Sequence, residues 1–348
     1  MKSLWTRLCG LLCAALLAVA FLAAAPAHAV EQALIDAAKK EGKVVWYVSL
    51  VENQLARPLA AAFEKKYPGI QVQIVPGTAT DLVIKLLGET KAGQIRGDVH
   101  HGGSSVWPLA KAGAIEKYVP EAAKAYPPEL KDPNGLWVAD ALYYLVAAVN
   151  TELVPAGSEP KTYQDLLDPK WKGKIAWTTQ MTQGGAAGFI GTVLQAMGQE
   201  KGMAFLKQLA AQKLVNVPSN QRVVLDQVIA GEYPLALATF NYHSDISAAK
   251  GAPVKWLKLE PVTGTLDTAF LLKGPNPNAG KLFLEFILSE DGQKVVANAG
   301  YLPAHPAVQA KVAAQKPEGG NYKALLLSPE LVESDLQKWI SVYNELFK

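Results

Sequence analysis

The sequence predicts an α/β fold in which a mainly parallel sheet is covered by helices. Strand-like and helix-like segments alternate along the chain, and this order is typical of β-α-β units. The chain has 348 residues, of which 50% are hydrophobic and 19% are charged. A chain of this size can bury a large core and commonly divides into two domains of roughly 150 residues. The composition excludes a disordered chain, a collagen and a small disulfide-stapled protein.

The first 29 residues carry the pattern of a secretory signal peptide. Lys2 and Arg7 form the charged start, residues 8–25 form the apolar stretch, and Ala27-His28-Ala29 forms the small-x-small cleavage site. We therefore expect cleavage before Val30 and export to the periplasm. A retained membrane anchor is the alternative, but the apolar run is short for spanning about 30 Å of hydrocarbon.

Both cysteines, Cys9 and Cys13, lie in this N-terminal segment. The mature chain is therefore expected to contain no disulfide, no thiolate metal site and no cysteine nucleophile. Losing Lys2 and Arg7 lowers the formal net charge from +3 to +1. Because this charge is small, an ionic partner has to be met by a local site, and nucleic acid is not an expected partner.

Two strands alternate with two helices at the start of the mature chain. The expected elements are a strand at 43–49, a helix at 55–67, a strand at 70–75 and a helix that ends near Gly93. The first strand is β-branched and aromatic, and the second alternates apolar and polar residues with period two. Pro68-Gly69 stops the first helix, and Thr80 or Asp81 is the expected N-cap of the second.

The same alternation returns later in the chain. The expected elements are a strand at 173–178, helices at 188–197 and 225–230, a strand at 233–240 and an amphipathic helix pair at 278–299. Residues 129–135 are mostly polar and include Pro133 and Gly135, so they are expected to form a surface loop or a crossing between lobes. Both halves of the chain are thus expected to build strands covered by helices.

Sequence motifs of common enzyme classes are absent. The chain has no nucleophile elbow, no phosphate-binding P-loop, no dinucleotide fingerprint after a strand and no H-E-x-x-H zinc motif. The adjacent His100 and His101 are expected to point to opposite sides of an extended segment. A periplasmic hydrolase or lyase that uses His101 or His243 as general base remains an alternative, but it needs an acid–base partner. We expect a protein that is not an enzyme and has no cofactor.

Six short motifs follow one another along the mature chain. They are YPGIQV at 67–72, GDVHHGG at 97–103, DPKWKGKI at 168–175, VIAGEYPLA at 228–236, LSEDGQ at 288–293 and GYLPAHP at 300–306. In this order they resemble the extracellular solute-binding proteins of ABC importers. The similar branch contains the ferric-ion-binding proteins and their phosphonate, sugar-phosphate and thiamine-binding relatives. The resemblance covers essentially all of the mature chain.

This resemblance implies a two-lobed type II periplasmic binding fold, in which each lobe is a mixed sheet flanked by helices and the ligand cleft lies between the lobes. Proteins of this kind close on their ligand by a hinge. Residues 30–138 and about 266–348 are expected to form lobe 1, and residues 139–265 are expected to form lobe 2. The expected partners are a small-molecule ligand and an inner-membrane ABC permease with its cytoplasmic ATPase. The protein itself is expected to be a monomer.

The resemblance also implies a site built from loops at the carboxyl ends of strands, where open α/β sheets bind ligands. The expected ligand-binding residues are Ser49, His101, Gly102, Gly103, Ser104, Thr182, Gly184, Gly185, Asn220, Arg222, Asn241, Tyr242, His243 and Asp267. Both glycine pairs precede predicted helices, whose free N–H groups and positive ends can hold phosphate, phosphonate or carboxylate oxygens. Arg222 would add a bidentate contact. The alternative is that the glycines only turn the chain and that Arg222 is a surface residue.

Aromatic residues divide between the core and the cleft. Tyr242 and Tyr301 are expected near the cleft because polar segments surround them. The aromatic residues expected in the core or between elements are Trp107, Trp137, Trp177, Tyr143 and Tyr144.

The ligand expectation rests on a departure from the ferric-binding pattern. Ferric-binding members typically place two adjacent tyrosines after the strand equivalent to 235–240, whereas this chain has Asn241-Tyr242. Their first-lobe histidine and glutamate positions fall near Val51 and Gly103. Because Fe(III) is a hard ion that prefers several anionic oxygens, the leading hypothesis is a small anionic organic solute such as a phosphonate or sugar phosphate. Ferric iron is the alternative, with His101, Tyr242 and His243 as candidate metal ligands.

Overall fold

The computed structural model describes residues 31–50, 52–103 and 105–348. The expected signal peptide, its two cysteines and Ser104 lie outside the described residues. The strands are β1 (Lys43–Val48), β2 (Gln71–Pro76), β3 (Val99–His101), β4 (Val138–Asn150), β5 (Ile175–Thr178), β6 (Val215–Val217), β7 (Leu235–Phe240), β8 (Val254–Leu257), β9 (Val262–Leu271), β10 (Leu302–Pro303) and β11 (Ala324–Leu326).

Helices separate most of these strands. They are α2 (Gln32–Glu41), α3 (Arg57–Lys66), α4 (Ala79–Lys91), α5 (Val106–Lys111), α6 (Ala186–Met197), α7 (Gln199–Ala211), α8 (Gln221–Ile229), α9 (Asn241–Ala248), α10 (Pro277–Leu288), α11 (Glu290–Asn298), α12 (Pro317–Gly320) and α13 (Pro329–Leu346). No helix in the described part of the chain is both long and apolar enough to cross a bilayer.

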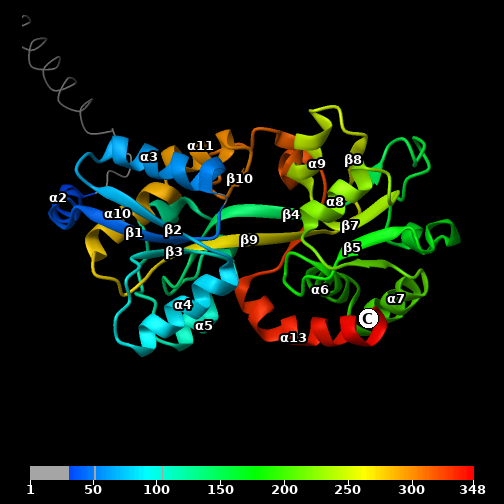
Figure 1. Cartoon of the computed structure of the whole chain (residues 1–348), viewed down its shortest axis with the longest axis horizontal. Coiled ribbons are helices and arrows are strands. Elements are labelled where there is room, and N and C mark those ends of the chain that lie inside the picture. The colour runs from blue at the N-terminus through cyan, green and yellow to red at the C-terminus, as the bar shows by residue number, and fades with distance from the viewer. Residues whose placement is uncertain (1–30, 51, 104) are drawn as a thin grey trace, which may run out of the picture.

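The chain forms two lobes that lie side by side (Figure 1). Neighbouring strands follow the order β2-β1-β3-β9-β4-β7-β5-β6, so one continuous path of paired strands runs through both lobes. The first lobe holds the parallel strands β1, β2 and β3, and the second holds the parallel strands β5, β6 and β7. This arrangement confirms the mixed two-lobed α/β fold that the sequence predicted.

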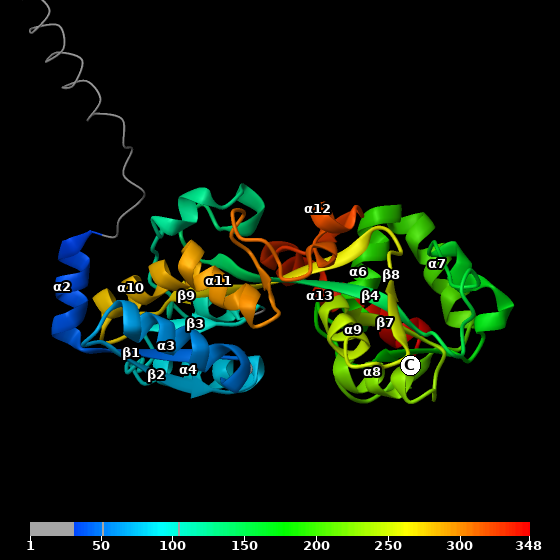
Figure 2. The same ribbon diagram turned by 90° about the horizontal axis from the view of Figure 1, so that it is seen from above.

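Two long antiparallel strands connect the lobes. All residues of β4 are buried, and β4 pairs with β9 from Val138↔Ala269 to Leu145↔Thr263. Figure 2 shows both strands passing from one lobe to the other. Residues 129–135 precede β4 and do not make the crossing. A polar loop cannot pair its backbone through a buried junction, whereas two hydrogen-bonded strands can.

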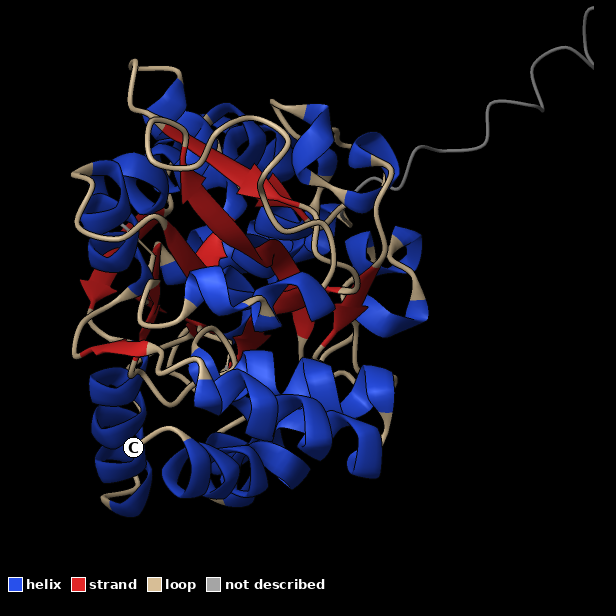
Figure 3. Ribbon diagram, turned by 90° about the vertical axis from the view of Figure 1, so that its right-hand side faces the viewer, coloured by secondary structure: helices blue, strands red, loops and turns tan. Residues whose placement is uncertain are grey.

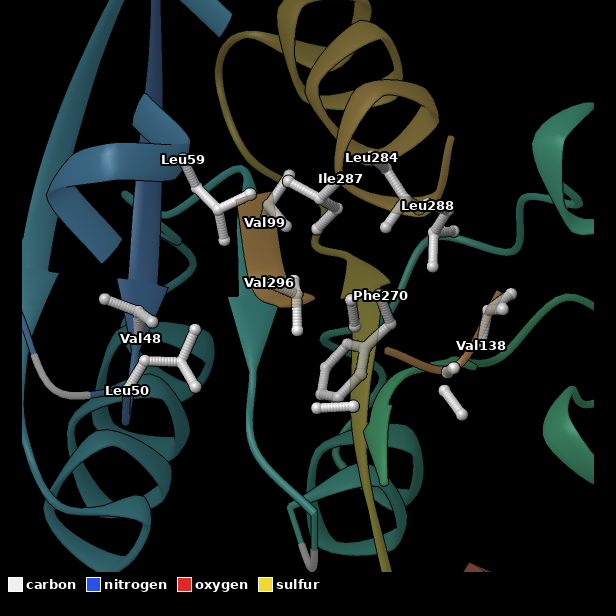
Figure 4. Packing of buried hydrophobic residues seen from close by; sticks show 14 of the residues in the cluster. Val48, Leu50, Leu59, Val99, Val138, Phe270, Leu284, Ile287, Leu288 and Val296 are labelled. Carbon is white, nitrogen blue, oxygen red and sulfur yellow. The ribbon is translucent and has the colours of Figure 1, made fainter. Parts of the chain in front are cut away.

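Each lobe has its own apolar core. In the first, the rings of Trp46 and Phe63 both lie 5.0 Å from that of Phe283, which brings α3 and α10 onto the sheet. Figure 4 shows Val48 of β1, Val99 of β3 and Phe270 of β9 in this core together with aliphatic side chains of α3, α10 and α11. In the second core, Trp177 of β5 packs against Phe189 of α6. Seen from the end of the second lobe, helices enclose its strands (Figure 3).

The C-terminal helix does not lie where we expected it. Residues 266–348 were expected with lobe 1, but α13 packs against α6 and contributes Val332, Trp339 and Tyr343 to the second core. Gly191 of α6 makes this contact possible, because a Cβ there would lie 2.6 Å from the Trp339 ring. The chain therefore returns to the second lobe after β11.

Several element ends also differ from expectation. A π-helical turn at Glu52–Ala56 precedes α3. The N-cap of α4 is Thr78, and not Thr80 or Asp81 as expected. Thr78 Oγ1 accepts a hydrogen bond from Asp81 N at 3.2 Å. Helix α8 begins four residues before the expected start at 225, because Asn220 caps it.

Candidate functional site

A cavity of about 300 Å³ lies between the lobes and takes its walls from both. Its described lining consists of Ser49, Leu50, Ala79 and Gly103 of the first lobe, Tyr143, Thr265, Leu266 and Asp267 of the crossing strands, Thr182, Gln183, Gly184, Gln221, Phe240 and Tyr242 of the second lobe, and Tyr301. Ser49 directly follows β1, and Tyr242 is the second residue after the end of β7. The cavity thus lies at the carboxyl ends of strands, where small ligands commonly bind in α/β proteins.

The turn after β3 is held by the buried His100. Its Nδ1 lies 3.2 Å from the Tyr47 carbonyl oxygen, and its Nε2 lies 2.9 Å from Ser105 Oγ. Since a carbonyl can only accept, Nδ1 donates to Tyr47, and the Ser105 hydroxyl beside Nε2 donates to the Gly102 carbonyl oxygen at 2.7 Å. Burial, together with the charge of His101, lowers the pKa of His100 to about 3. His100 is therefore a neutral structural residue that fixes the turn reaching Gly103.

His101 points the other way, toward the cavity floor, as adjacent residues of a strand should. Its Nδ1 lies 3.3 Å from Ser49 Oγ, and its Nε2 lies 3.3 Å from Asp140 Oδ2 and 3.6 Å from Asp267 Oδ2. Nε2 is within ion-pair distance of both carboxylates, yet it makes no hydrogen bond of good geometry with either. His101 is fully buried and lies behind Asp267, which does line the cavity.

Asp140 is brought to this cluster by an irregularity in the long strand pair. The register of β4 on β9 shifts between Ala139 and Ala141, so Asp140 is the additional residue and turns inward. Burial raises the pKa of Asp140 to about 6, and the charge of Asp267 also raises it, while His101 opposes both. The cluster therefore joins one imidazole to two carboxyl groups.

Aromatic rings form one wall of the cavity. The Tyr242 ring lies 5.6 Å from Phe240, 5.6 Å from Tyr301 and 6.1 Å from Tyr143, measured between ring centres. Burial raises the pKa of each of the three phenols, and the charge of Asp267 raises all three as well. The phenols are therefore neutral at physiological pH and can donate hydrogen bonds.

The turn Thr182–Gly184, which leads into α6, forms another wall. Gly185 is its N-cap and has no side chain to satisfy the first N–H groups of the helix. A Cβ at this position would lie 2.2 Å from the Gln180 carbonyl oxygen, so only glycine fits the turn. Gln221 donates to the Gly184 carbonyl oxygen and holds the turn from α8. The positive end of this 12-residue helix therefore lies next to the turn that lines the cavity.

The expected site residues divide into two groups. Six line the cavity: Ser49, Gly103, Thr182, Gly184, Tyr242 and Asp267. Of the others, Gly102 and Gly185 shape the two turns, and His101 lies behind the wall. Asn220 caps α8 through a 3.1 Å bond from Val223 N to its Oδ1. Asn241 is buried, with its Nδ2 donating to the Gln315 carbonyl oxygen at 2.8 Å.

The two remaining residues, Arg222 and His243, lie beside the cavity and do not line it. Arg222 forms an ion pair with Asp226 of the same helix at 2.7 Å, and its side chain is 41% exposed. His243 packs on Tyr242 with ring centres 4.3 Å apart. Burial lowers the pKa of His243 to about 4, and the charge of Arg222 contributes. Among the described residues, no group of three or more His, Cys, Asp or Glu side chains could hold a metal ion.

Eight lining residues besides Tyr301 were absent from the expected ligand-binding residues: Leu50, Ala79, Tyr143, Gln183, Gln221, Phe240, Thr265 and Leu266. Of these, Tyr143 was expected in the core. Tyr143 lies on a fully buried strand, so its sequence context does not separate it from core residues. Gln183 lies between Thr182 and Gly184, which were both expected at the ligand, and this position was the available signal.

Two α/β lobes that share long strands and enclose a polar cavity define a two-lobed binding protein of the type II periplasmic class. The model of the bacterial extracellular solute-binding protein family matches residues 58–321, and the chain belongs to this family. The resemblance predicted from the sequence is thus confirmed. The protein is the solute-binding component of an ABC importer, and its family consists of transport proteins.

Relatives of known name are distant. The chain is 25% identical over 248 residues to "Iron uptake protein A1" of Synechocystis sp., and the matched region covers 67% of this chain and 68% of the relative. It is 26% identical over 254 residues to "Putative 2-aminoethylphosphonate-binding periplasmic protein" of Salmonella paratyphi A, covering 68% and 69%. The crystal structure of iron-bound HitA from Pseudomonas aeruginosa is 25% identical, with a TM-score of 0.73 over 87% of this chain and 99% of that one.

Proposed function

We propose that the protein captures a small organic solute with an anionic group, such as a phosphonate or sugar phosphate, and delivers it to its permease. It would act as an exported monomer, after removal of residues 1–29, and the partner permease would carry a cytoplasmic ATPase. The observation that supports this proposal is the cavity between the lobes, with neutral donors on both sides. Ser49 and the three phenols supply hydroxyl groups, and the start of α6 supplies N–H groups. Closure of the lobes would enclose the solute.

Neutral hydrogen-bond donors suffice to hold an oxyanion. A helix N-terminus with free N–H groups stabilises phosphate or carboxylate oxygens. The relative with the printed name 2-aminoethylphosphonate-binding protein supports a phosphonate for this chain. Arg222 is not required, because it is paired with Asp226 outside the lining.

Ferric iron is the second candidate, favoured by one observation. The phenols of Tyr143, Tyr242 and Tyr301 share the cavity with the Asp267 carboxylate. Phenolate and carboxylate oxygens are hard ligands, and a bound metal ion removes the protons of its ligands. The relatives named for iron support this candidate. The phenol set differs from the metal ligands expected from the sequence, of which only Tyr242 lines the cavity.

We propose that the protein binds its solute and does not catalyse a reaction with His101 or His243 as general base. His101 lies behind Asp267, and His243 lies against Phe240 and Tyr242, so neither lines the described cavity. A general base must reach the proton that it removes.

A thermal-shift screen tests the proposed function. Phosphonates, sugar phosphates and Fe(III) citrate are each titrated against the exported protein, freed of endogenous ligand by partial unfolding and dialysis. A solute at a hundredfold excess over Kd stabilises the protein by about 2.7 kcal/mol. We expect a phosphonate or sugar phosphate to raise the melting temperature by several degrees and to make the scattering radius smaller. A shift and a visible absorption band with Fe(III) alone would instead establish iron as the cargo.

Substitution of Gly103 by alanine is expected to weaken binding of the best solute from this screen by about ten- to a hundredfold, equivalent to 1–3 kcal/mol. A Cβ at position 103 would lie 2.8 Å from the Leu266 carbonyl oxygen and 2.9 Å from Asp267 Oδ1, so it would narrow the cavity. Isothermal titration calorimetry measures the change.

Gly88→Ala is the matched control for this variant. Gly88 lies within α4, where a Cβ has no heavy atom within 4 Å. It should bind as the wild type does. Equal affinities for all three proteins would show that Gly103 does not border the binding site.

A further inference from the structure

The charges around the cavity are unbalanced. Among its described lining residues, Asp267 has the only ionisable side chain apart from the phenols, and lysine, arginine and histidine do not occur. The Asp267 side chain is 24% exposed, so its carboxylate can reach a ligand. A purely anionic solute would meet a like charge here without a cationic side chain to offset it.

His101 is shared between this carboxylate and that of Asp140. Its Nε2 lies 3.3 Å from Asp140 and 3.6 Å from Asp267, so a single imidazole faces two carboxyl groups. Nε2 makes no well-directed hydrogen bond to either, and Asp140 Oδ1 also has no partner. Asp267 therefore retains the capacity to accept hydrogen bonds from the cavity side.

The surroundings of Asp267 suit a cation. The wall of Tyr143, Tyr242, Tyr301 and Phe240 presents neutral aromatic rings, and cations bind favourably over such rings. A carboxylate beside several aromatic rings is a combination that selects an ammonium group. The turn Thr182–Gly184, which directly precedes the N-cap of α6, forms another part of the lining, and the positive end of this helix suits the opposite charge.

We propose that the cargo is a small zwitterion whose ammonium group binds Asp267 and the surrounding aromatic rings, while its acid group binds at the start of α6. This inference rests on the proposed function and narrows its substrate class. The cavity of about 300 Å³ holds on the order of ten water-sized groups, which suits an aminoalkyl acid of a few carbons. Asp267 is the residue that discriminates such a solute from a simple anion.

Two isosteric probes test the assignment on the ligand-free protein. 2-Aminoethylphosphonate and propylphosphonate have the same chain length and differ by an ammonium in place of a methyl group. We expect the wild type to bind the amine at least tenfold more tightly, as measured by calorimetry at pH 7.5. In the Asp267→Asn variant this ratio should fall to within about threefold. Asp226→Asn, which removes the same charge from α8 outside the cavity lining, should keep the wild-type ratio.

The outcomes of these titrations separate the zwitterion assignment, the role of Asp267 and the proposed function from one another. If propylphosphonate binds the wild type as tightly as the amine does, the zwitterion assignment is overturned and capture of an anion stands. If the tenfold ratio persists in Asp267→Asn, the ammonium is recognised elsewhere and the role of Asp267 is overturned. If neither phosphonate nor any sugar phosphate binds, the proposed function itself fails. The wild-type ratio decides the first question even where the Asp267 variant does not fold.

Discussion

Replacing Asp98 with alanine is expected to lower the free energy of unfolding by about 4 kcal/mol. The fully buried carboxylate accepts hydrogen bonds from Val45 N at 2.8 Å, Asn276 N at 2.8 Å and Asn276 Nδ2 at 2.9 Å. Asp98 directly precedes β3, and Asn276 directly precedes α10. The three bonds therefore link β1, β3 and α10 to one another. Alanine would leave these three donors unsatisfied in the core of the first lobe. The midpoint of urea denaturation, at unchanged m-value, measures the loss.

Asp291→Ala is the matched control in the same lobe. Asp291 forms an exposed ion pair with Lys66 at 2.6 Å, and such pairs contribute about 1 kcal/mol or less. Equal destabilisation by the two variants would contradict the structural role assigned to Asp98.

Acidification from pH 6.5 to pH 4 is expected to destabilise the protein through two buried histidines. Folding lowers the pKa of His100 to about 3 and that of His243 to about 4, both from an ordinary 6.5. The unfolded chain therefore binds these protons first, and stability falls as the pH drops through this window. At 1.36 kcal/mol for each pKa unit, the complete effects are about 5 kcal/mol for His100 and about 3 kcal/mol for His243.

Asp140 acts in the opposite direction. Folding raises its pKa from 3.8 to about 6, so the folded state takes up this proton first and gains stability as the pH falls from 6 to 4. Its complete effect is about 3 kcal/mol, which is smaller than the two histidine contributions together. The net result is a loss of stability in acid.

Unfolding by urea at a series of pH values checks this balance. His243→Phe should lose less stability than the wild type between pH 6.5 and pH 4, by up to about 3 kcal/mol, and the pH profiles should run parallel at pH 8. The variant keeps the packing against Phe240 and Tyr242. Superimposable pH profiles for the two proteins would rule out His243 as a contributor.

The local elements of this fold were largely predictable from the sequence. β1, β2, α6, β7 and the helix pair α10–α11 occur within a few residues of their expected positions, because apolar periodicity depends on near neighbours in the chain. The order of the motifs indicated the family, and the family match confirms it. The ligand remains a prediction.

Long-range packing was not predictable in the same way. The apolar face of α13 fits either core as far as its sequence shows, and only the structure pairs Trp339 with the small Gly191. Asn241 was expected at the ligand, but its amide bonds to Gln315, which lies 74 positions away. For two other residues that were expected at the ligand, the neighbouring sequence already indicated a structural role. The spacing of four between Arg222 and Asp226 is typical of an ion pair within a helix, and Asn220 stands where a helix cap is favoured.

The return of α13 to the second lobe separates the two ends of the described chain. Helix α2 lies at the far edge of the first lobe, and the C-terminus lies on the second (Figure 1). A donor dye attached to α2 and an acceptor dye attached at Lys348 would therefore lie on different lobes. Energy transfer between them would then convert cargo capture into an optical signal, without any label near the binding residues.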